Sequence, residues 1–218
     1  MIVAIDGPAG AGKSTVARAV ADRLGFTYVD TGALYRAVTL AAIETDTPVD
    51  DGPAVARVAQ GLDLELDGPR TCLNGRDVTE DIRAREITAA VSTVAAHPEV
   101  RAVLASIQMS LARAGDVVME GRDIGSTIAP DAPVKVFLTA SLRERARRRL
   151  GQLGVDDDES ALVDAERSIE KRDSEDESRA SSPFVRPPDA VVIDSTGKTS
   201  NEIVDQIVAL VAAREAPR

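Results

Sequence analysis

Short apolar runs separated by helical patterns organise most of this chain. The first run, at 2–5, leads into a glycine-rich stretch, and apolar residues then recur at helical spacing from Val16 to Leu24. Four more apolar runs have the length and composition of buried strands, at 28–29, 117–119, 134–138 and 190–193. Buried strands that alternate with helices are typical of a parallel sheet covered on both faces. The pattern therefore predicts an α/β fold with an open parallel five-stranded sheet and helices on both of its faces.

One segment breaks this alternation. The run 62–66 alternates leucines with acidic residues, and Asp-Gly-Pro at 67–69 is typical of a turn. Asn74-Gly75 follows between short apolar stretches, which is a strong hairpin signal. We therefore expect a small antiparallel hairpin insert at about 62–80.

Two helix starts carry the spacing of a capping box, in which two residues three positions apart satisfy each other's backbone N–H groups. Thr199 and Glu202 mark the start of the last helix, and Ser141 and Glu144 mark an earlier one. Both pairs precede residues with helical periodicity, so we expect a helix to begin at each.

Charge and composition narrow the possible partners. The chain has 26 basic and 36 acidic residues, a net charge of −10 at pH 7. Nucleic-acid polymers are bound through broad basic surfaces, so we expect none as a partner, whereas a small nucleotide needs only a few local cations. A single cysteine, Cys72, excludes an internal disulfide, and no apolar run approaches the ~20 residues of a membrane span. We expect a cytoplasmic monomer with no membrane partner and no targeting peptide before the first strand.

A phosphate-binding loop follows the first strand. The pattern G-x-x-x-x-G-K-S/T is matched in full by Gly7, Pro8, Ala9, Gly10, Ala11, Gly12, Lys13 and Ser14, and Thr15 continues into the helix. Backbone N–H groups in such a loop converge on phosphate oxygens at the positive end of the helix. Lys13 would reach the β- and γ-phosphates of ATP, and the Ser14 hydroxyl would bind Mg²⁺. The loop predicts a nucleotide site but not a reaction, although the lack of an Asn-Lys-x-Asp motif disfavours a GTPase.

Further segments carry a resemblance. Asp-Thr-Gly at 30–32 precedes a helix with Tyr35 and Arg36, as in the acceptor-binding segment of nucleoside monophosphate kinases. Together with 120–125, 130–135 and 172–179, the chain resembles the bacterial cytidylate kinases, a family of P-loop kinases. The resemblance extends over essentially the whole chain and includes the hairpin insert.

The resemblance implies an activity and a division of the chain. The reaction would be ATP- and Mg²⁺-dependent phosphorylation of CMP and dCMP to CDP and dCDP, with these small molecules as partners. The P-loop core would comprise 1–30, 98–139 and 182–218. The acceptor-binding region would comprise 31–97, and a short helical lid with arginine-rich helices would comprise 140–181.

The resemblance also assigns the acceptor site. Arg36, Arg122 and Arg179 would hold the acceptor phosphate, Arg172 and Asp176 the ribose, and Ser92, Arg101 and Asp123 the cytosine, with Thr31 and Tyr35 also in this site. Arginine forks match phosphate oxygens, and Arg122 lies just past a strand, where ligands bind in open α/β sheets. An arginine donor beside an aspartate acceptor fits cytosine, whose ring offers acceptors at O2 and N3 and a donor at N4. Ordinary surface ion pairs for the arginines, and a helix-end hydroxyl for Ser92, remain alternatives.

A single helix face changes from apolar to charged along its length. It comprises Leu162, Ala165, Ile169, Arg172, Asp176 and Arg179, which step by three and four residues. We expect one end of this helix to pack on the core and the other to face a polar cavity. A helix that leaves the core for solvent is the alternative.

Five arginines crowd one predicted helix: Arg143, Arg145, Arg147, Arg148 and Arg149. Like charges so close repel unless an anion is near, so we interpret the segment as a lid over the transferring phosphoryl group. Lys13, Arg122, Arg148 and Arg149 would be catalytic, with Glu120 reaching Mg²⁺ through a water molecule. A solvated basic face balanced by Glu144 and the acidic tract 156–159 is the alternative interpretation.

Two other functions remain open beside cytidylate phosphorylation. Another P-loop kinase could act on UMP, AMP or shikimate, which the Arg101–Asp123 pair opposes. An ATP-hydrolysing switch is the other, which the lid arginines disfavour. His97 and Cys72 have no partners in the sequence for base, nucleophilic or metal chemistry.

Overall fold

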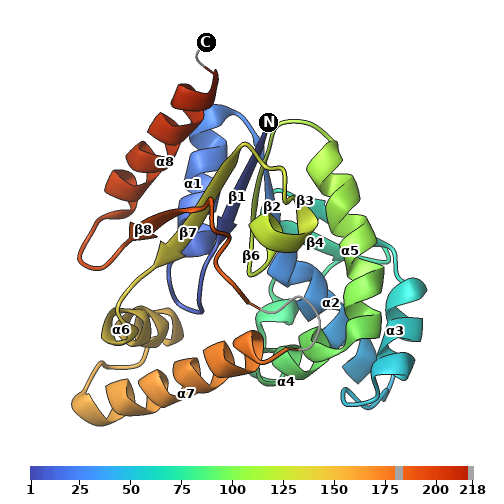
Figure 1. The fold of residues 1–218 in the computed structure, drawn as a ribbon. Helices are drawn as coiled ribbons and strands as arrows, with labels where there is room; N and C mark the ends of the chain where they lie inside the picture. The colour runs from blue at the N-terminus through green and yellow to red at the C-terminus, as the bar shows by residue number, and fades with distance from the viewer. Residues whose placement is uncertain (180–183, 216–218) are drawn as a thin grey trace.

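A parallel five-stranded sheet forms the centre of the molecule, in the order β2-β6-β1-β7-β8 (Figure 1). The computed structural model describes residues 1–179 and 184–215. The strands are β1 (Ile2–Asp6), β2 (Thr27–Asp30), β6 (Val117–Gly121), β7 (Val134–Thr139) and β8 (Val191–Asp194). Every neighbouring pair runs parallel. The predicted sheet is confirmed, with each apolar run in its own strand.

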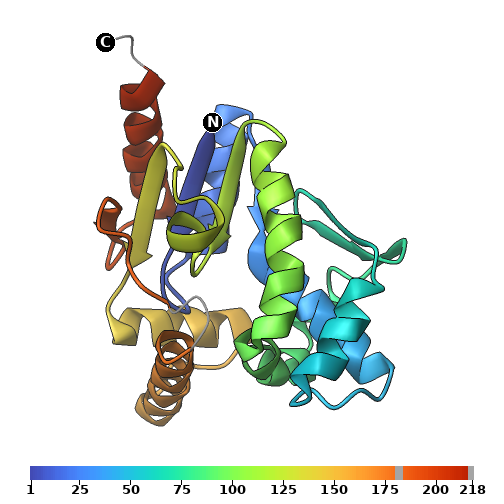
Figure 2. The ribbon, with the colours of Figure 1, turned by 45° about the vertical axis from the view of Figure 1, so that its right-hand side comes forward.

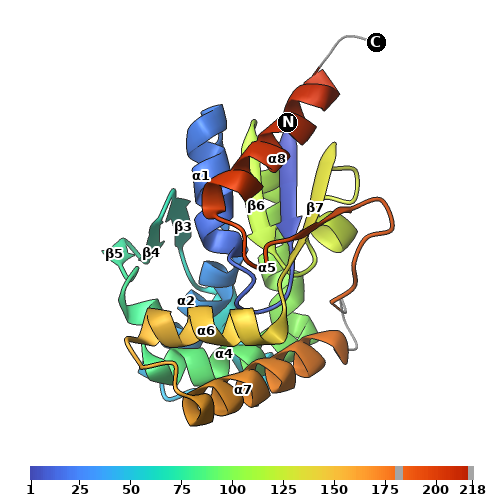
Figure 3. The ribbon, with the colours of Figure 1, turned by 90° about the vertical axis from the view of Figure 1, so that its left-hand side faces the viewer.

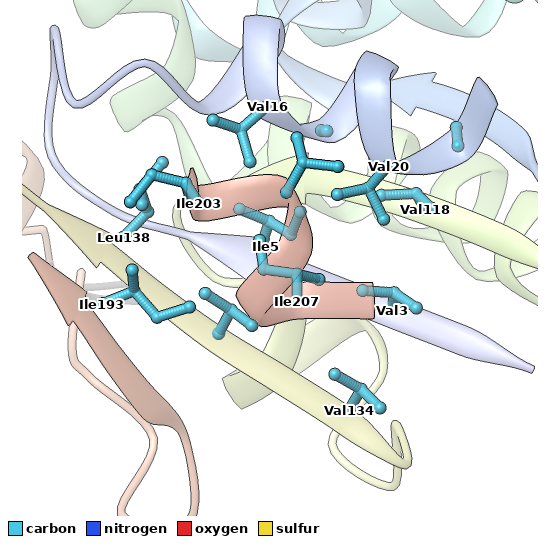
Figure 4. Packing of buried hydrophobic residues seen from close by; sticks show 14 of the residues in the cluster. Val3, Ile5, Val16, Val20, Val118, Val134, Leu138, Ile193, Ile203 and Ile207 are labelled. Carbon is cyan, nitrogen blue, oxygen red and sulfur yellow. The ribbon is translucent and has the colours of Figure 1, made fainter. Parts of the chain in front are cut away.

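Helices cover both faces of this sheet (Figure 2). Val3 and Ile5 point to the face covered by α1 (Lys13–Leu24) and α8 (Ser200–Glu215), where they pack in one apolar cluster with residues such as Ile207 (Figure 4). Ala4 points to the other face, which is covered by α5 (Pro98–Arg113) and the π-helical turn η2 (Ile124–Ile128). The strand thus buries both of its faces, which is why its sequence is a continuous apolar run.

The predicted acceptor-binding region, 31–97, contains the expected antiparallel insert, which is larger than one hairpin. The helices of the region are α2 (Thr31–Glu44), α3 (Gly52–Gln60), the 3₁₀ turn η1 (Asp81–Arg83) and α4 (Arg85–Ala96). The insert is a three-stranded sheet of β3 (Leu64–Asp67), β4 (Arg70–Leu73) and β5 (Arg76–Asp77). The Asn74-Gly75 turn joins β4 to β5 with φ values of 51° and 76°, as a primed hairpin turn requires. The turn at 67–69 closes a second hairpin of its own, which accounts for the third strand.

Two further helices lie across the carboxyl ends of the strands (Figures 1 and 3). They are α6 (Leu142–Leu153) and α7 (Glu159–Glu177). The apolar start of α7 packs with α6 and with Ala9 of the phosphate-binding loop, and its charged end buries Asp176 at 2% exposure. A helix leaving for solvent is therefore wrong. The predicted helical position of Arg179 is also wrong, because α7 ends two residues earlier.

The predicted boundaries between core, acceptor region and lid stay predictions. Residues 180–183 and 216–218 fall within the predicted lid and core ranges but lie outside the described residues. Across the described part of the chain, no helix combines the length and apolar character that crossing a membrane requires.

Candidate active site

The phosphate-binding loop connects β1 to α1 at the carboxyl edge of the sheet. Gly7 passes so close to β7 that an added Cβ would lie 2.0 Å from the carbonyl oxygen of Leu138, so only glycine fits. Lys13, which is 7% exposed, begins the helix and donates from Nζ to the carbonyl of Pro8 at 2.9 Å. Burial, followed by the charges of Arg122 and other cations, lowers the pKa of Lys13 to about 7. Lys13 therefore lies in a buried position that disfavours its charged form, with Arg122 and Arg172 nearby.

A cavity of about 420 Å³ opens beside this loop. Its lining includes Gly12, Thr15, Arg148, Gln152, Ser195 and Lys198. Ser195 and Lys198 come from the loop between β8 and α8, and neither was predicted from the sequence as a site residue. Their position just past a strand was the available signal, because ligands bind at the carboxyl ends of strands in open α/β sheets.

Two arginines of α6, in the predicted lid, contact the backbone of the phosphate-binding loop. Arg145 donates to the carbonyl of Ala9 at 3.0 Å and forms an ion pair with Asp173, which itself accepts the Ala9 N–H at 3.0 Å. Arg148 donates to the carbonyl of Ala11 at 3.1 Å and to the Ser195 hydroxyl at 2.9 Å. These bonds hold α6 directly against the loop. Asp173 carried no functional prediction, since nothing in its sequence context indicates a partner 164 positions away.

The outer arginines of α6 fit the alternative interpretation of this helix, a solvated basic face. Arg143 pairs with Glu159, and Arg147 pairs with Glu144 and Asp157, so both belong to a solvated face balanced by acidic neighbours. Arg149 differs: among the described residues it has no ion pair or hydrogen bond. Burial is the main cause of the lowered pKa values of Arg36 and Arg172, and the charge of Arg149 adds to both shifts.

Partly buried arginines gather at the predicted acceptor site. Burial, and then the charge of Arg122, lowers the pKa of Arg172 to about 10, and burial also lowers the pKa of Arg36. The Nε atom of Arg172 is buried without a hydrogen-bond partner among the described residues. Asp176 pairs with both Arg122 and Arg179, and it is the only carboxylate with ion pairs to this group in the described chain. Positive charge therefore exceeds negative charge here, as a site for an anion requires.

Arg36 is held by neutral acceptors instead of a carboxylate. It donates to the carbonyl of Ile82 at 3.1 Å and to the Thr88 hydroxyl at 2.9 Å. An ordinary surface ion pair is therefore wrong for Arg36, and its charge remains available to a ligand.

The residues predicted to read the base come together. Arg101 and Asp123 form an ion pair with side chains 7% and 8% exposed, and the Arg101 guanidinium lies 5.5 Å from the centre of the Tyr35 ring. Ser92 lies inside α4, so the alternative of a helix-end hydroxyl is wrong. Thr31 already donates its hydroxyl to the carbonyl of Glu120 at 2.7 Å, which leaves only its oxygen lone pairs for a ligand.

The candidate metal ligands are one hydroxyl and one carboxylate. Ser14 is exposed in the first turn of α1. Glu120 is 4% exposed and accepts a hydrogen bond from the Tyr28 hydroxyl at 2.6 Å, while burial and then Asp30 raise its pKa to about 7. No group of three or more His, Cys, Asp or Glu side chains within the described residues could hold a metal ion.

The fold and this site define the class of P-loop kinases. The parallel sheet carries a phosphate-binding loop after β1, and helices with arginines lie over that loop. A gluconokinase from Sinorhizobium meliloti 1021 has the same fold, with 19% identity, a TM-score of 0.50, and coverage of 98% of this chain and 93% of that chain. A protein from Eubacterium ventriosum ATCC 27560 also shares the fold, with 14% identity, a TM-score of 0.56, and coverage of 98% and 99%.

Sequence comparison identifies the family. The family model described as cytidylate kinase matches residues 3–213. A cytidylate kinase of Symbiobacterium thermophilum is 47% identical over 213 residues, covering 95% of this chain and 94% of the relative. A cytidylate kinase of Caldanaerobacter subterraneus is 48% identical over 205 residues, covering 94% and 92%. The chain belongs to the cytidylate kinase family of nucleoside monophosphate kinases, which are phosphotransferases, and the resemblance is confirmed.

Proposed function

We propose that this chain transfers the γ-phosphoryl group of ATP to CMP and dCMP, giving CDP or dCDP and ADP. The observation that carries the proposal is the buried Arg101–Asp123 pair, whose aspartate follows β6 at the same edge of the sheet as the phosphate-binding loop. The names of the relatives support the same acceptor.

The donor binds at the phosphate-binding loop. Residues 7–15, apart from Pro8, supply backbone N–H groups for the ATP phosphates, and Lys13 leaves the Pro8 carbonyl to bind the β- and γ-phosphates. The cavity beside the loop is of the size of small-molecule sites and accommodates the nucleoside of ATP.

The residues present fit a magnesium ion. Mg²⁺ keeps several waters and binds through few protein oxygens together with phosphates, so a dedicated carboxylate cage is not needed. The exposed Ser14 hydroxyl would hold it, and Glu120 would contact it through water. When bound, the ion neutralises charge on the transferring phosphates.

The acceptor phosphate binds to the partly buried arginines. Arg36, Arg122 and Arg179 offer guanidinium groups whose combined charge exceeds that of Asp176. Arg172 and Asp176 hold the ribose hydroxyls, for which Asp176 exchanges part of its bonding to Arg122. Thr31 and Tyr35 complete the walls of this site.

The base is read by complementary donors and acceptors. Arg101 donates to the acceptor edge of cytosine, and Asp123 accepts from its N4 amino group. Ser92 supplies a hydroxyl to the same ring. Uracil presents an oxygen at position 4, so it would set an acceptor against the Asp123 carboxylate in a buried site.

The chemistry needs positioning and charge neutralisation more than a base. The acceptor phosphate is already ionised at neutral pH, so its oxygen attacks the γ-phosphorus in line without giving up a proton. Lys13, Arg122, Arg148 and Arg149 neutralise the charge that spreads over the transferring group. Closure of the lid (140–181) and the acceptor region (31–97) over the core excludes water, which otherwise competes as acceptor.

The cellular setting follows from the reaction. We place the enzyme in the cytoplasm, where its nucleotide substrates are found. We also propose that it is a monomer. The single cysteine, Cys72, is unpaired and agrees with a reducing compartment.

A panel of acceptors tests the proposal. ADP release is measured by a coupled assay with CMP, dCMP, UMP, AMP, shikimate or no acceptor, with Mg²⁺ present. CMP and dCMP should give kcat/KM values at least about tenfold above those of the others. Equal kcat/KM values for UMP and CMP would contradict the account of the base site, and ADP release independent of any acceptor would favour a hydrolysing switch.

A further inference from the structure

A buried carboxylate joins the two halves of the candidate site. Asp6 ends β1 and directly precedes the phosphate-binding loop. Its side chain is 2% exposed and accepts two backbone hydrogen bonds, from the N–H of Ile124 at 2.9 Å and from the N–H of Gly125 at 2.7 Å. These two residues directly follow the Arg122–Asp123 dipeptide, so one carboxylate connects the donor loop to the residues that face the acceptor.

The segment that Asp6 holds is a compact unit. Ile124 and Gly125 open the π-helical turn η2, and the first N–H groups of a helix have no acceptor within it. Thr127 and Ile128 then donate back to the carbonyl of Asp123 at 2.9 and 3.2 Å. The backbone of Asp123 is thus fixed from both sides. Such π-helical turns are rare and occur frequently at functional sites.

The Asp6 carboxylate is mostly ionised although it is buried, and burial disfavours the charged form. Burial raises the pKa of Asp6 to about 6, although the two N–H bonds oppose that rise, so the group is mostly ionised at neutral pH. An ionised Asp6 can accept both bonds at once, whereas an amide in its place accepts one and turns a donor toward the other N–H. Perturbed carboxyl groups of this kind are concentrated at functional sites.

We propose that Asp6 is a positioning residue, which holds the Arg122–Asp123 segment in register with the phosphate-binding loop so that acceptor and donor meet in line. The inference rests on the proposed function of those two segments. Asp6 itself touches neither substrate. Its effect should therefore appear in the binding and discrimination of the acceptor, and only weakly in the binding of ATP.

The Asp6→Asn variant tests this inference in the full chain. We expect KM for CMP to rise by about tenfold or more and the CMP-to-UMP ratio of kcat/KM to fall by a similar factor, because small misplacements near the reacting groups cost up to about a hundredfold. KM for ATP should change by less than about threefold. The matched control is Asp51→Asn, which removes the charge from another helix-capping carboxylate, at the start of α3, and should change neither KM nor the acceptor ratio.

The outcomes separate this inference from the proposed function. If the wild-type chain does not phosphorylate CMP, the proposed function fails whatever Asp6 does. If the wild-type is active but D6N loses CMP and ATP binding equally, or loses only thermal stability, the positioning role is refuted. Should D6N not fold, the smaller Asp6→Ser replacement is measured in the same way. Amide exchange in the wild-type gives a check without mutation: Ile124 and Gly125 should exchange as slowly as Met119 in β6, and exchange as fast as Gly68 in its turn would overturn the proposal.

Discussion

Replacing Asp123 by asparagine tests how the base is read. In the free enzyme Asp123 pairs with Arg101, and both side chains are buried. Arg101 has only donors, so the amide oxygen of the new side chain will stay with the guanidinium and the amide NH₂ will turn toward the base. That donor faces the N4 amino group of cytosine, where it repels, but it matches the O4 oxygen of uracil.

The magnitude follows from the burial of the pair. A buried donor left without an acceptor costs about 1–3 kcal/mol, and each 1.4 kcal/mol is about a tenfold change. The CMP-to-UMP ratio of kcat/KM should therefore fall by about 10- to 100-fold in D123N, as measured by coupled ADP release with each acceptor. Loss of the buried charge partner of Arg101 will also lower stability, by about 3 kcal/mol, so thermal unfolding is followed in parallel.

A second, partly buried ion pair provides the control. Asp173 pairs with Arg145 at 13% and 11% exposure, on the lid and away from the base. Asp173→Asn should lower kcat/KM for CMP and UMP by the same factor and leave their ratio unchanged. If D123N also lowers kcat/KM for CMP and for UMP by the same factor, Asp123 has a structural role and the account of base reading is wrong.

Three further predictions concern the donor loop and the sheet edge. Burial raises the pKa of Asp6 from 3.8 in the unfolded chain to about 6 in the folded chain. The contribution of Asp6 to stability is therefore full below pH 3.8 and is lost as pH rises through about 6. Relative to D6N, the wild-type should thus lose about 3 kcal/mol of unfolding free energy over that window, and a flat difference in denaturant titrations would refute this. Gly7→Ala should abolish ATP binding and lower Tm, because the new Cβ would collide with the Leu138 carbonyl. A nucleotide-binding titration measures the affinity for ATP, and an unchanged affinity would contradict the close approach. Arg148→Ala should raise KM for ATP by about tenfold, because its bonds to Ala11 and Ser195 are lost, and should leave KM for CMP unchanged. Steady-state kinetics with each substrate varied measure both values, and an equal rise in the two KM values would contradict the prediction.

Features set by neighbouring residues could be predicted from the sequence. The Thr199–Glu202 capping box forms as expected, with the Thr199 N–H donating to Glu202 at 2.8 Å and the Glu202 N–H donating to Thr199 at 3.3 Å. At Ser141 only half of the box forms, because Glu144 turns to Arg147 and Arg148 instead. Local spacing predicts a helix start reliably, but competing partners decide which side-chain bonds it makes.

Long-range contacts set the limit of the sequence analysis. Asp173 accepts the N–H of Ala9, which is 164 positions away in the sequence. Asp6 accepts the N–H groups of Ile124 and Gly125, which are 118 and 119 positions away. Nothing local marks such partners, because they depend on which strand ends meet at the edge of the sheet. Family resemblance named the arginines, Asp123 and Asp176, but it named neither Asp6 nor Asp173, which bind backbone groups from distant parts of the chain.

The transfer itself can be followed with labelled ATP. Wild-type protein is incubated with Mg²⁺, CMP and ATP that carries ¹⁸O in its γ-phosphoryl group, and the products are analysed by mass spectrometry. Direct transfer predicts that the labelled phosphoryl group appears intact as the β-phosphate of CDP, with little labelled inorganic phosphate. Label released as inorganic phosphate while CMP remains unchanged would contradict the proposal that this chain is a cytidylate-phosphorylating enzyme.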